Sequence, residues 1–397
     1  KLAEISAEFY GVQPKTIIAV TGTNGKTSTT IFAQQLWEMA GKKAVSMGTI
    51  GIHGSGIERD GAMTTPDPVT LHKDLADLSE KGITHLAIEA SSHGLDQYRL
   101  DGVNIKAAGF TNLSRDHLDY HPDMEDYLRA KARLFTDLLE EGGVAVLNAD
   151  APQFEDLKSK CTNVISYGFA GDDYKVIKTV PTAYGQDVQL QIDGEEHEIH
   201  FPFVGEFQLM NALCALGLVS MGKSANDYIH FFKNLKGVPG RLQPVSGHPG
   251  GAGIYIDYAH TPDALENVLK AARPHTENRL ICITGCGGDR DKGKRPQMAK
   301  MASELADYAI ITDDNPRSED PAAIRADMIA GIEKDNFEEV DGRGAAIHKA
   351  IHDLQKGDVL IIAGKGHEQG IEFADRTEPF DDVQEAEKSI QQLLNAK

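Results

Sequence analysis

The sequence predicts an α/β protein with mostly parallel sheets, divided into two units. Short, continuous apolar strands alternate with helices along most of the chain, which is typical of a parallel sheet covered on both faces. Between residues 172 and 204 polar and apolar residues alternate instead, which predicts a small antiparallel sheet. The chain has 397 residues, whereas one hydrophobic core rarely serves more than ~250–300, so two domains are expected.

The first unit is predicted from apolar runs that end in polar or glycine-rich loops. Strands are expected over residues 16–20, 44–50, 85–91, 105–113 and 143–150, with a glycine-rich hairpin extending to Gly61. Helices are expected in the stretch that Gly41 ends and over residues 69–80, 123–141 and 207–222.

The second unit repeats the alternation of strand and helix. Its apolar strands lie within residues 254–259, 279–288, 308–314 and 358–366, and a helix is expected after each. The segment 236–245 contains glycine and proline and is expected to act as a hinge. We place the domains at residues 1–237 and 238–397, and the second is long enough for a core of its own.

The composition excludes several classes of protein. Sixty acidic and 40 basic residues give a formal net charge of −20, which argues against nucleic-acid binding. Four cysteines in so long a chain are not a disulfide framework. No apolar run approaches the ~20 residues of a membrane span and no signal peptide is apparent, so we expect a cytoplasmic protein without membrane insertion.

The strongest motif is a phosphate-binding loop, which follows the strand 16–20 and opens a helix, as such a loop requires. Its glycines permit a tight turn whose N–H groups approach phosphates, Lys26 would contact the β- and γ-phosphates, and Thr27 would offer Mg²⁺ a hydroxyl. The common pattern has glycine where this chain has Val20. The residues expected to bind the nucleotide are Gly22, Thr23, Asn24, Gly25, Lys26, Thr27 and Ser28.

Acidic and histidine side chains follow other strands of the first unit. Glu89 ends an apolar strand, at the edge where parallel sheets bind ligands, and is a candidate Mg²⁺ ligand; the alternative is an acid that merely begins a loop. By pattern alone, Lys131 is an ordinary helix lysine. A cluster of residue types that suit Mg²⁺ follows the strand 105–113 and consists of Arg115, Asp116, His117, Asp119 and His121.

Three polar loops follow strands of the second unit and would share one edge of its sheet. Each loop taken alone could be a plain polar connection. Arginine among them suits a substrate carboxylate and Glu368 suits an amine, so together they predict a zwitterionic substrate. The loops are GCGGDRDKGKR (285–295), DDNPR (313–317) and GKGHEQG (364–370).

Ten motifs in one order, spread over nearly the whole chain, resemble those of the Mur ligases, which build the peptide of bacterial cell-wall precursors. They are TGTNGKTS, IEASSHGLDQYR, TNLSRDHLDYH, the AK of the helix over 123–141, MNALCAL, PGRLQ, IDYAHTPDAL, GCGGDRDKGKR, DDNPR and GKGHE. Within the family the chain resembles the members that add the third residue to UDP-N-acetylmuramoyl-L-alanyl-D-glutamate. The resemblance implies a central ATP-binding domain of the P-loop type, followed by a Rossmann-like C-terminal domain that binds the amino acid.

The reaction that this resemblance implies is ATP-driven amide formation in peptidoglycan synthesis. ATP would phosphorylate the side-chain carboxylate of D-glutamate to an acyl phosphate, the incoming amine would attack, and phosphate would leave. Such chemistry needs positioning and charge neutralisation more than a strong base. In this family DNPR marks users of meso-diaminopimelate; Arg317 would bind the distal carboxylate that lysine lacks, and lysine would leave it unpaired.

The resemblance also implies roles around ATP. Lys26 would stabilise the transferring phosphoryl group, Thr27 and Glu89 would hold one Mg²⁺, and His117 would serve a second. Lys131 matches a lysine that becomes carbamylated, which turns an ammonium into an anion able to face Mg²⁺ and the γ-phosphate. Positions that match contacts to ATP outside the loop are Asn211, Arg241 and Asp257.

Two further groups of residues match substrate contacts in the family. Those matching contacts to the uridine-linked substrate are Thr64, Thr65, Ser91, Gln97 and Arg99. Those matching the amino-acid pocket are Arg290, Asp314, Asn315, Pro316, Arg317, Gly364 and Glu368.

One departure from the family keeps alternatives open. Family members carry an N-terminal UDP-binding domain, which this sequence lacks, so UDP binding and turnover by this chain are open at this stage. The alternatives are a lysine-adding relative, which DNPR disfavours, and a nucleotide-binding fragment without catalysis. A P-loop GTPase switch is disfavoured because no guanine-reading N-K-x-D motif is evident.

Overall fold

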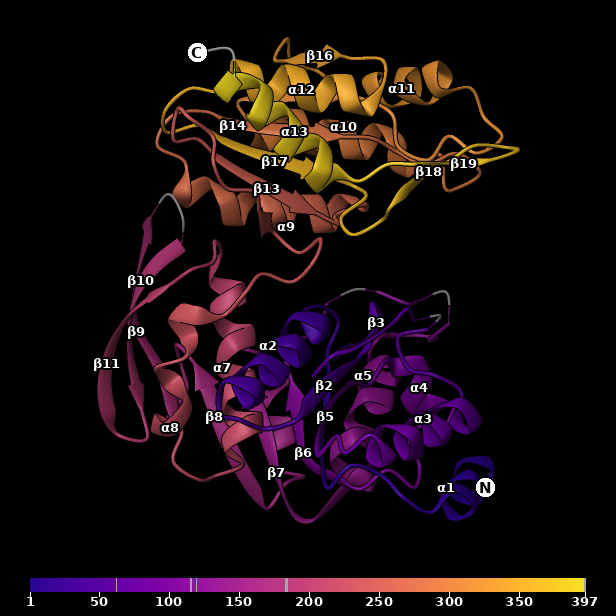
Figure 1. Cartoon of the computed structure of the whole chain (residues 1–397), viewed down its shortest axis with the longest axis vertical. Helices are drawn as coiled ribbons and strands as arrows, with labels where there is room; N and C mark the ends of the chain where they lie inside the picture. Colours follow the sequence, from indigo (N-terminus) through magenta and orange to yellow (C-terminus); the bar gives the residue numbers. More distant parts are fainter. Residues whose placement is uncertain (62, 115, 119, 183–184, 396–397) are drawn as a thin grey trace. The chain divides into compact units, whose positions relative to one another are not determined.

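A large, mostly parallel sheet forms the centre of the first unit in the computed structural model of the chain, which describes residues 1–61, 63–114, 116–118, 120–182 and 185–395 (Figure 1). Among these residues the sheet has eleven strands, in the order β11-β10-β9-β8-β7-β6-β1-β5-β2-β3-β4. Its parallel strands are β1 (Thr16–Thr21), β2 (Ala44–Gly48), β5 (His85–Glu89), β6 (Ile105–Phe110), β7 (Leu139–Asn148) and β8 (Asn163–Gly168). Because they run in one direction, the loops after β1, β5 and β6 meet at one edge.

The remaining strands extend the two sides of this sheet. On one side β3 (Gly51–Gly54) and β4 (Ile57–Arg59) form the predicted hairpin next to β2. On the other side lie β9 (Tyr174–Thr182), β10 (Gly185–Ile192) and β11 (Glu195–Phe201). The strands expected over residues 172–204 therefore exist, but they continue the large sheet, with β9 pairing in parallel with β8, rather than forming a separate one.

Helices cover both faces of the large sheet, as the continuous apolar strands predicted. The helices α2 (Lys26–Met39) and α7 (Glu206–Ser220) contact each other and pack on one face (Figure 1). Alternate residues of β1, Ile17 and Ala19, join a core with Leu71 and Leu75 on the other face. The other helices of the unit are α1 (Leu2–Tyr10), α3 (Pro68–Glu80), α4 (Ser92–Asp96), α5 (Met124–Arg133), α6 (Phe154–Lys158) and α8 (Asn226–Ile229), with a 3₁₀ turn at Phe232–Asn234.

The helix predicted over residues 123–141 is too long at its C-terminal end. The helix α5 ends at Arg133, a π-helical turn spans Leu134–Leu138, and β7 begins at Leu139. Leu134 and Phe135 of this turn are buried in the core below the sheet. Packing of these apolar side chains, rather than helix propensity, therefore decides the end of the helix.

The second unit is built on a six-stranded sheet in the order β12-β13-β17-β14-β15-β16 among the described residues. Its parallel strands are β13 (Gly253–Asp257), β14 (Leu280–Thr284), β15 (Tyr308–Ile311), β16 (Phe337–Glu339) and β17 (Val359–Ala363), with β12 (Gln243–Pro244) antiparallel at one side. A separate hairpin consists of β18 (Gly370–Glu372) and β19 (Thr377–Pro379).

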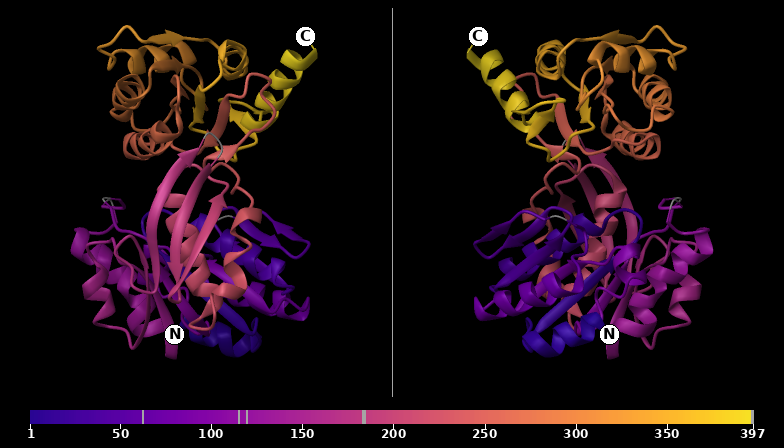
Figure 2. Two further views of the ribbon diagram at one scale, coloured as in Figure 1. Left: turned by 90° about the vertical axis from the view of Figure 1, so that its left-hand side faces the viewer. Right: turned by 90° about the vertical axis from the view of Figure 1, so that its right-hand side faces the viewer.

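Two apolar cores flank this second sheet. One includes Leu265, Met298 and Ile324, and the other includes Ile347 and Ile390. The helices are α9 (Pro262–Ala272), α10 (Lys294–Leu305), α11 (Pro321–Ile329), α12 (Arg343–Asp353) and α13 (Asp382–Asn395), with a 3₁₀ turn at Arg273–His275; α13 leads to the C-terminus (Figure 2). The predicted α/β class with two sheets is confirmed. None of the helices in the described part of the chain has the length and apolar character that a membrane span needs.

The contacts divide the chain into two compact units. The first comprises residues 1–180, 187–202 and 206–236, and the second comprises 181–186, 203–205 and 237–397. The segment 203–205 follows β11, and its Val204 joins one of the two apolar cores of the second unit.

Candidate functional sites

The phosphate loop lies between β1 and α2 and its conformation needs glycine. Gly22 and Gly25 have φ values of 146° and 87°, which side chains other than glycine's rarely allow. A Cβ atom on Gly25 would lie 2.3 Å from Oδ1 of Asn211, on α7. The Lys26 ammonium donates to the carbonyls of Gly22 (2.9 Å) and Thr23 (2.8 Å). The loop is therefore compact, and Asn211 lies directly against it.

The loop after β6 holds the phosphate loop in place. The N–H of Asn24 donates to Oδ1 of Asn112 (3.0 Å), and the Thr111 hydroxyl donates to the carbonyl of Asn24 (2.6 Å). The Thr23 hydroxyl lies 3.2 Å from the hydroxyl of Tyr127 on α5. These bonds join the ends of two neighbouring parallel strands, as expected where such sheets bind ligands.

Glu89 ends β5 beside this loop and is completely buried. The N–H and hydroxyl of Thr49 donate to its two oxygens at 2.9 and 3.2 Å. Burial raises the pKa of the carboxyl group, whereas Lys26, the N–H of Thr49 and the Thr27 hydroxyl lower it. A Cβ on Gly48 would lie 2.0 Å from Oε1, so glycine at that position makes room for the carboxylate. The result is a buried acid aimed at the loop.

Lys131, which the pattern alone gave no reason to select, is buried next to the same loop. Its ammonium donates to the carbonyl of Gly22 (2.9 Å) and lies 4.4 Å from the ring centre of Tyr127. Burial, and then the neighbouring charge of Lys26, hold its pKa well below the ordinary value, with Asp116 acting in the opposite sense. A lysine in these surroundings favours the neutral, nucleophilic amine.

The histidine cluster after β6 lies over Tyr127. The ring of His117 lies 6.0 Å from that of Tyr127 and 5.0 Å from that of His93, and its backbone has a positive φ of 53°. His121 is buried, with Nδ1 2.9 Å from the carboxylate of Asp126. Burial raises the pKa of Tyr127 to about 12. Arg115 and Asp119, named with this cluster, lie outside the described residues.

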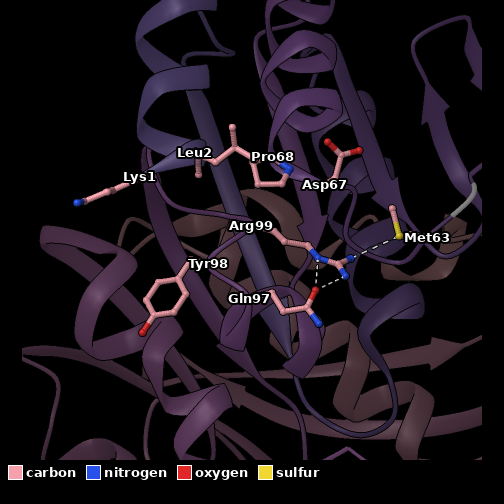
Figure 3. Close-up of a pocket in the computed structure, with 9 residues that line it drawn as sticks. Lys1, Leu2, Met63, Asp67, Pro68, Gln97, Tyr98 and Arg99 are labelled. Atoms are coloured by element: carbon pink, nitrogen blue, oxygen red, sulfur yellow. Dashed lines mark hydrogen bonds between the residues drawn. The ribbon is translucent and has the colours of Figure 1, made fainter.

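The five residues matched to the uridine-linked substrate form one connected group. The Thr65 hydroxyl donates to the carbonyl of Glu89 (2.8 Å) and lies 3.0 Å from the hydroxyl of Ser91. Arg99 donates to the carbonyl of Thr65 (2.7 Å) and, as Figure 3 shows, to Oε1 of Gln97 (3.1 Å). The hydroxyl of Thr64 lies 3.0 Å from that of Thr49, which in turn bonds to Glu89. This group therefore leads from Glu89 to a surface pocket, lined by Lys1, Leu2, Ala3, Met63, Asp67, Pro68, Gln97, Tyr98 and Arg99.

In the second unit, Asp257 ends β13 and is buried. Its two oxygens accept the N–H groups of Leu242 (2.7 Å) and Ala259 (2.8 Å). Burial raises the pKa of this carboxyl group, while Arg241 lowers it. The guanidinium of Arg241 lies 4.8 Å from the ring centre of Tyr258. Arg241 and Asp257 are thus neighbours at the carboxyl end of β13.

The loops after β15 and β17 meet as the sequence predicted. The Asn315 amide donates to Oε2 of Glu368 (2.9 Å), and the buried ammonium of Lys365 donates to the same oxygen (2.9 Å). Gly364 has a φ of 122°, and a Cβ there would lie 2.7 Å from Oδ2 of Asp314. Glycine therefore lets the two loops approach closely.

The loop after β14 completes this group. A Cβ on Gly288 would lie 1.9 Å from the carbonyl oxygen of Pro316, so these loops also touch. Arg317 donates from Nη1 to the carbonyl of Gly288 (2.9 Å), and its Nε pairs with Glu372 of β18 at 2.8 Å. In the absence of substrate Arg317 therefore already has Glu372 as a partner, and the expectation that bound lysine would leave it unpaired stays a prediction. Arg290, by contrast, is exposed on its loop.

Sequence reasoning missed several residues of these sites. Tyr127 precedes Lys131 by four residues on α5, and that spacing, which places both on one helix face, was a usable signal. Lys365 belongs to the loop GKGHEQG, which the sequence singled out, but no role of its own followed from the sequence. Gly48, Thr49 and Glu372 carried no signal, because only folding brings them to Glu89 and Arg317.

A phosphate loop beside a buried acid, together with a second α/β unit whose loops hold Arg317 and Glu368, defines an ATP-dependent ligase that joins an acid to an amine. Comparison with protein families agrees. The Mur ligase middle domain matches residues 20–219, and the Mur ligase glutamate ligase domain matches residues 240–366. The chain belongs to the Mur ligase family, so it is an ATP-dependent, amide-bond-forming ligase, as its motifs predicted.

Similar proteins support this assignment over almost the full chain. Proteins of Mesorhizobium japonicum and Agrobacterium fabrum named UDP-N-acetylmuramoyl-L-alanyl-D-glutamate--2,6-diaminopimelate ligase are each 47% identical to it, over 98% and 100% of this chain and 81% and 82% of their own length. A solved structure of a protein with that name has a TM-score of 0.76 and 36% identity over 99% of this chain and 82% of its own. Mycobacterium tuberculosis folylpolyglutamate synthase, solved with ADP and AMPPCP, shares the fold, with a TM-score of 0.71 and 18% identity over 100% of this chain and 96% of its own.

Proposed function

We propose that the chain adds meso-diaminopimelate to the side-chain carboxylate of D-glutamate in UDP-N-acetylmuramoyl-L-alanyl-D-glutamate, at the expense of ATP, in peptidoglycan precursor synthesis. The observation that carries this proposal is that the loop after β15, which holds the cation Arg317, is joined to the loop after β17, which holds the anion Glu368, by the hydrogen bonds of Asn315 and Lys365. Such a pair suits a substrate end that bears both a carboxylate and an amine. The names of the relatives reported above support the same substrate.

The ATP phosphates are assigned to the loop of residues 22–28. Its glycines, the N-terminus of α2 and Lys26 supply N–H groups and positive charge for phosphates. Lys26 would turn from the carbonyls of Gly22 and Thr23 to the transferring phosphoryl group, where developing charge needs it most. Asn211, Arg241 and Asp257 are proposed as further contacts to ATP.

Mg²⁺ fits the donors beside this loop. The Thr27 hydroxyl and the Glu89 carboxylate are hard oxygen ligands, and a cation would offset the burial that raises the pKa of Glu89. His117 would serve a second ion. When bound, Mg²⁺ supplies neutralisation of phosphate charge.

Lys131 is proposed to act as a carbamate. Its neutral amine would add to carbon dioxide, forming an N–C bond and releasing one proton, which leaves a carboxylate-like anion at the end of the side chain. Burial and the nearby Lys26 favour the amine that this step requires. The anion would then face the cations bound beside the phosphate loop.

The acceptor substrate is assigned to Thr64, Thr65, Ser91, Gln97 and Arg99. In the reaction, a carboxylate oxygen of D-glutamate would attack the γ-phosphorus, giving an acyl phosphate and ADP. The amine of diaminopimelate would then attack the acyl carbon, and phosphate and a proton would leave. The chain's own contribution is orientation and charge neutralisation. Both substrates are soluble molecules, so the cytoplasm is the proposed location, and the net charge of −20 argues against a nucleic-acid partner.

Phosphate release tests the proposal. The chain would be mixed with ATP, Mg²⁺ and UDP-N-acetylmuramoyl-L-alanyl-D-glutamate, in parallel with meso-diaminopimelate and with L-lysine. Release that requires meso-diaminopimelate and ignores lysine is the expected result. Equal use of lysine would contradict the substrate assignment and favour the lysine-adding relative. Calorimetric ATP binding without release in any mixture would contradict catalysis by this chain.

A further inference from the structure

The ammonium of Lys365 is fully buried beside Glu368, and the reaction proposed above assigns it no role. Resting on the proposed function, we propose that Lys365 is a positioning residue, which orients Glu368 and Asn315 so that Glu368 can accept the amine of the amino-acid substrate. Lys365 has an exposed fraction of 0%, whereas the Glu368 side chain is 34% exposed. The lysine therefore acts from behind the carboxylate that a substrate would meet.

The backbone around Lys365 turns its side chain inward. Gly364 and Gly366 both have positive φ values, 122° and 58°. A Cβ on Gly366 would lie 2.7 Å from Cβ of Tyr258, so a larger residue has no room there. The N–H of Glu368 donates to the carbonyl of Lys365 (3.0 Å), which closes a tight turn. This turn brings the side chains of residues 365 and 368 together.

Three side chains then form a closed triangle of hydrogen bonds. The Lys365 ammonium donates to Oδ1 of Asn315 (2.8 Å) and to Oε2 of Glu368 (2.9 Å), and Nδ2 of Asn315 donates to the same Oε2 (2.9 Å). Oδ1 of Asn315 also accepts the N–H of Glu372 (3.0 Å), which fixes the orientation of the amide. Within the described residues, both of the bonds that reach Glu368 use Oε2 and leave Oε1 for a ligand.

The cost of burying the Lys365 ammonium favours a role in positioning Glu368 over a role in attracting the substrate. A buried ammonium is costly unless charged and hydrogen-bonding partners satisfy it, and here the partners come from two loops 50 residues apart in sequence. Lys365 thus fastens the loop after β17 to the loop after β15. The ammonium of Lys365 offsets part of the charge of Glu368 and so does not strengthen its attraction for an amine. Its contribution to amine binding is to orient the carboxylate.

Steady-state kinetics of four variants test this inference. Lys365→Met keeps the length of the stem but removes the ammonium, Glu368→Gln removes the proposed acceptor, and the third variant combines both. The expected result for Lys365→Met is a KM for meso-diaminopimelate raised about 10- to 100-fold, with the KM for ATP changed by less than about twofold. The double variant should lose no more than Glu368→Gln alone, because Lys365 acts through that residue. Lys300→Met, a surface lysine on α10 paired with Glu304, is the matched control.

Three outcomes would overturn the inference. They are an unchanged KM for the amino acid in Lys365→Met, an equal rise in the KM for ATP, and multiplicative losses in the double variant. If Lys365→Met does not fold, Lys365→Gln keeps N–H donors without the charge, and failure of both to fold would assign Lys365 to stability instead. A wild-type chain that releases no phosphate with any amino acid contradicts the proposed function, whereas an active wild type with normal variants contradicts only the role of Lys365.

Discussion

In both units the parallel strands end in polar loops, but the buried charged side chains at these ends have different kinds of partner. In the first unit, hydroxyl and N–H groups hold Glu89, and a carbonyl and an aromatic ring hold Lys131, while the charges of Lys26 and Asp116 act on the pKa values of Glu89 and Lys131 respectively. In the second unit several buried charges form ion pairs, whereas Asp257 accepts the backbone N–H groups of Leu242 and Ala259. Arg343 and Asp382 are both fully buried and joined by two bonds of 2.7 Å. Lys365 similarly pairs with Glu368.

This difference indicates the charge of the ligand that each site can bind. A buried charge without a counter-charge costs stability, and such groups gather where a ligand brings the compensating charge. The first site suits ligands with large charges, such as phosphates and Mg²⁺. In the second site Arg317 pairs with Glu372 and Lys365 pairs with Glu368. Arg343 fixes this site further by donating to the carbonyls of Asp313, in the loop after β15, and of Ala363, at the end of β17. That arrangement suits a zwitterion.

The largest expected effect is a loss of activity when the buried amine of the first unit is removed. Lys131→Met should lower kcat by about 10²- to 10³-fold, because the proposed carbamate anion would be lost from the phosphate site. Removal of carbon dioxide should lower the activity of the wild type reversibly, with recovery on adding bicarbonate, and should leave the variant unaffected. Phosphate release measures both. Lys81→Met, which changes an exposed lysine directly after α3, is the control, and a fully active Lys131→Met would refute the carbamate.

A moderate effect on substrate selectivity is expected at the pair of Arg317 and Glu372, because the proposed substrate carboxylate would compete with Glu372 for Arg317. Glu372→Gln removes the carboxylate that pairs with Nε of Arg317, so the distal carboxylate of meso-diaminopimelate no longer displaces it. The ratio of kcat/KM for meso-diaminopimelate over lysine should rise by about 3- to 10-fold, since lysine then leaves Arg317 without an anion. A fall in this ratio would instead show that Glu372 holds Arg317 in its binding orientation.

The smallest expected effect is a change in thermal stability when the buried carboxylate of Glu89 is neutralised. Burial raises the folded-state pKa of Glu89 above its ordinary value of 4.5, so the folded protein binds the proton more tightly than the unfolded one, and stability falls as pH rises through this range. Without nucleotide and Mg²⁺, Glu89→Gln should therefore raise Tm at pH 7.5 by about 2–4 °C. The gain should vanish as the pH approaches 4.5. A lower Tm at pH 7.5 would mean that the ionised carboxylate stabilises the fold.

Much of the site was predictable because short motifs encode local backbone. The loop TGTNGKTS between strand and helix was recognisable, as were DDNPR and GKGHE at strand ends. The end of α5 was not, because burial of Leu134 and Phe135 outweighs the helical pattern that continues past them. The strands over 172–204 were placed in a separate sheet because alternation reveals a strand's faces but not which strand it pairs with.

The sequence by itself determined the strands, the phosphate loop and the residue types available at each strand end, since these depend on composition and spacing within a few residues. Only the tertiary structure decided that Lys131 is a buried amine, that Arg317 already has Glu372 as a partner, and that Lys365 stands behind Glu368. Burial and charge pairing depend on residues distant in sequence, and it is they that set the pKa and direction of a side chain.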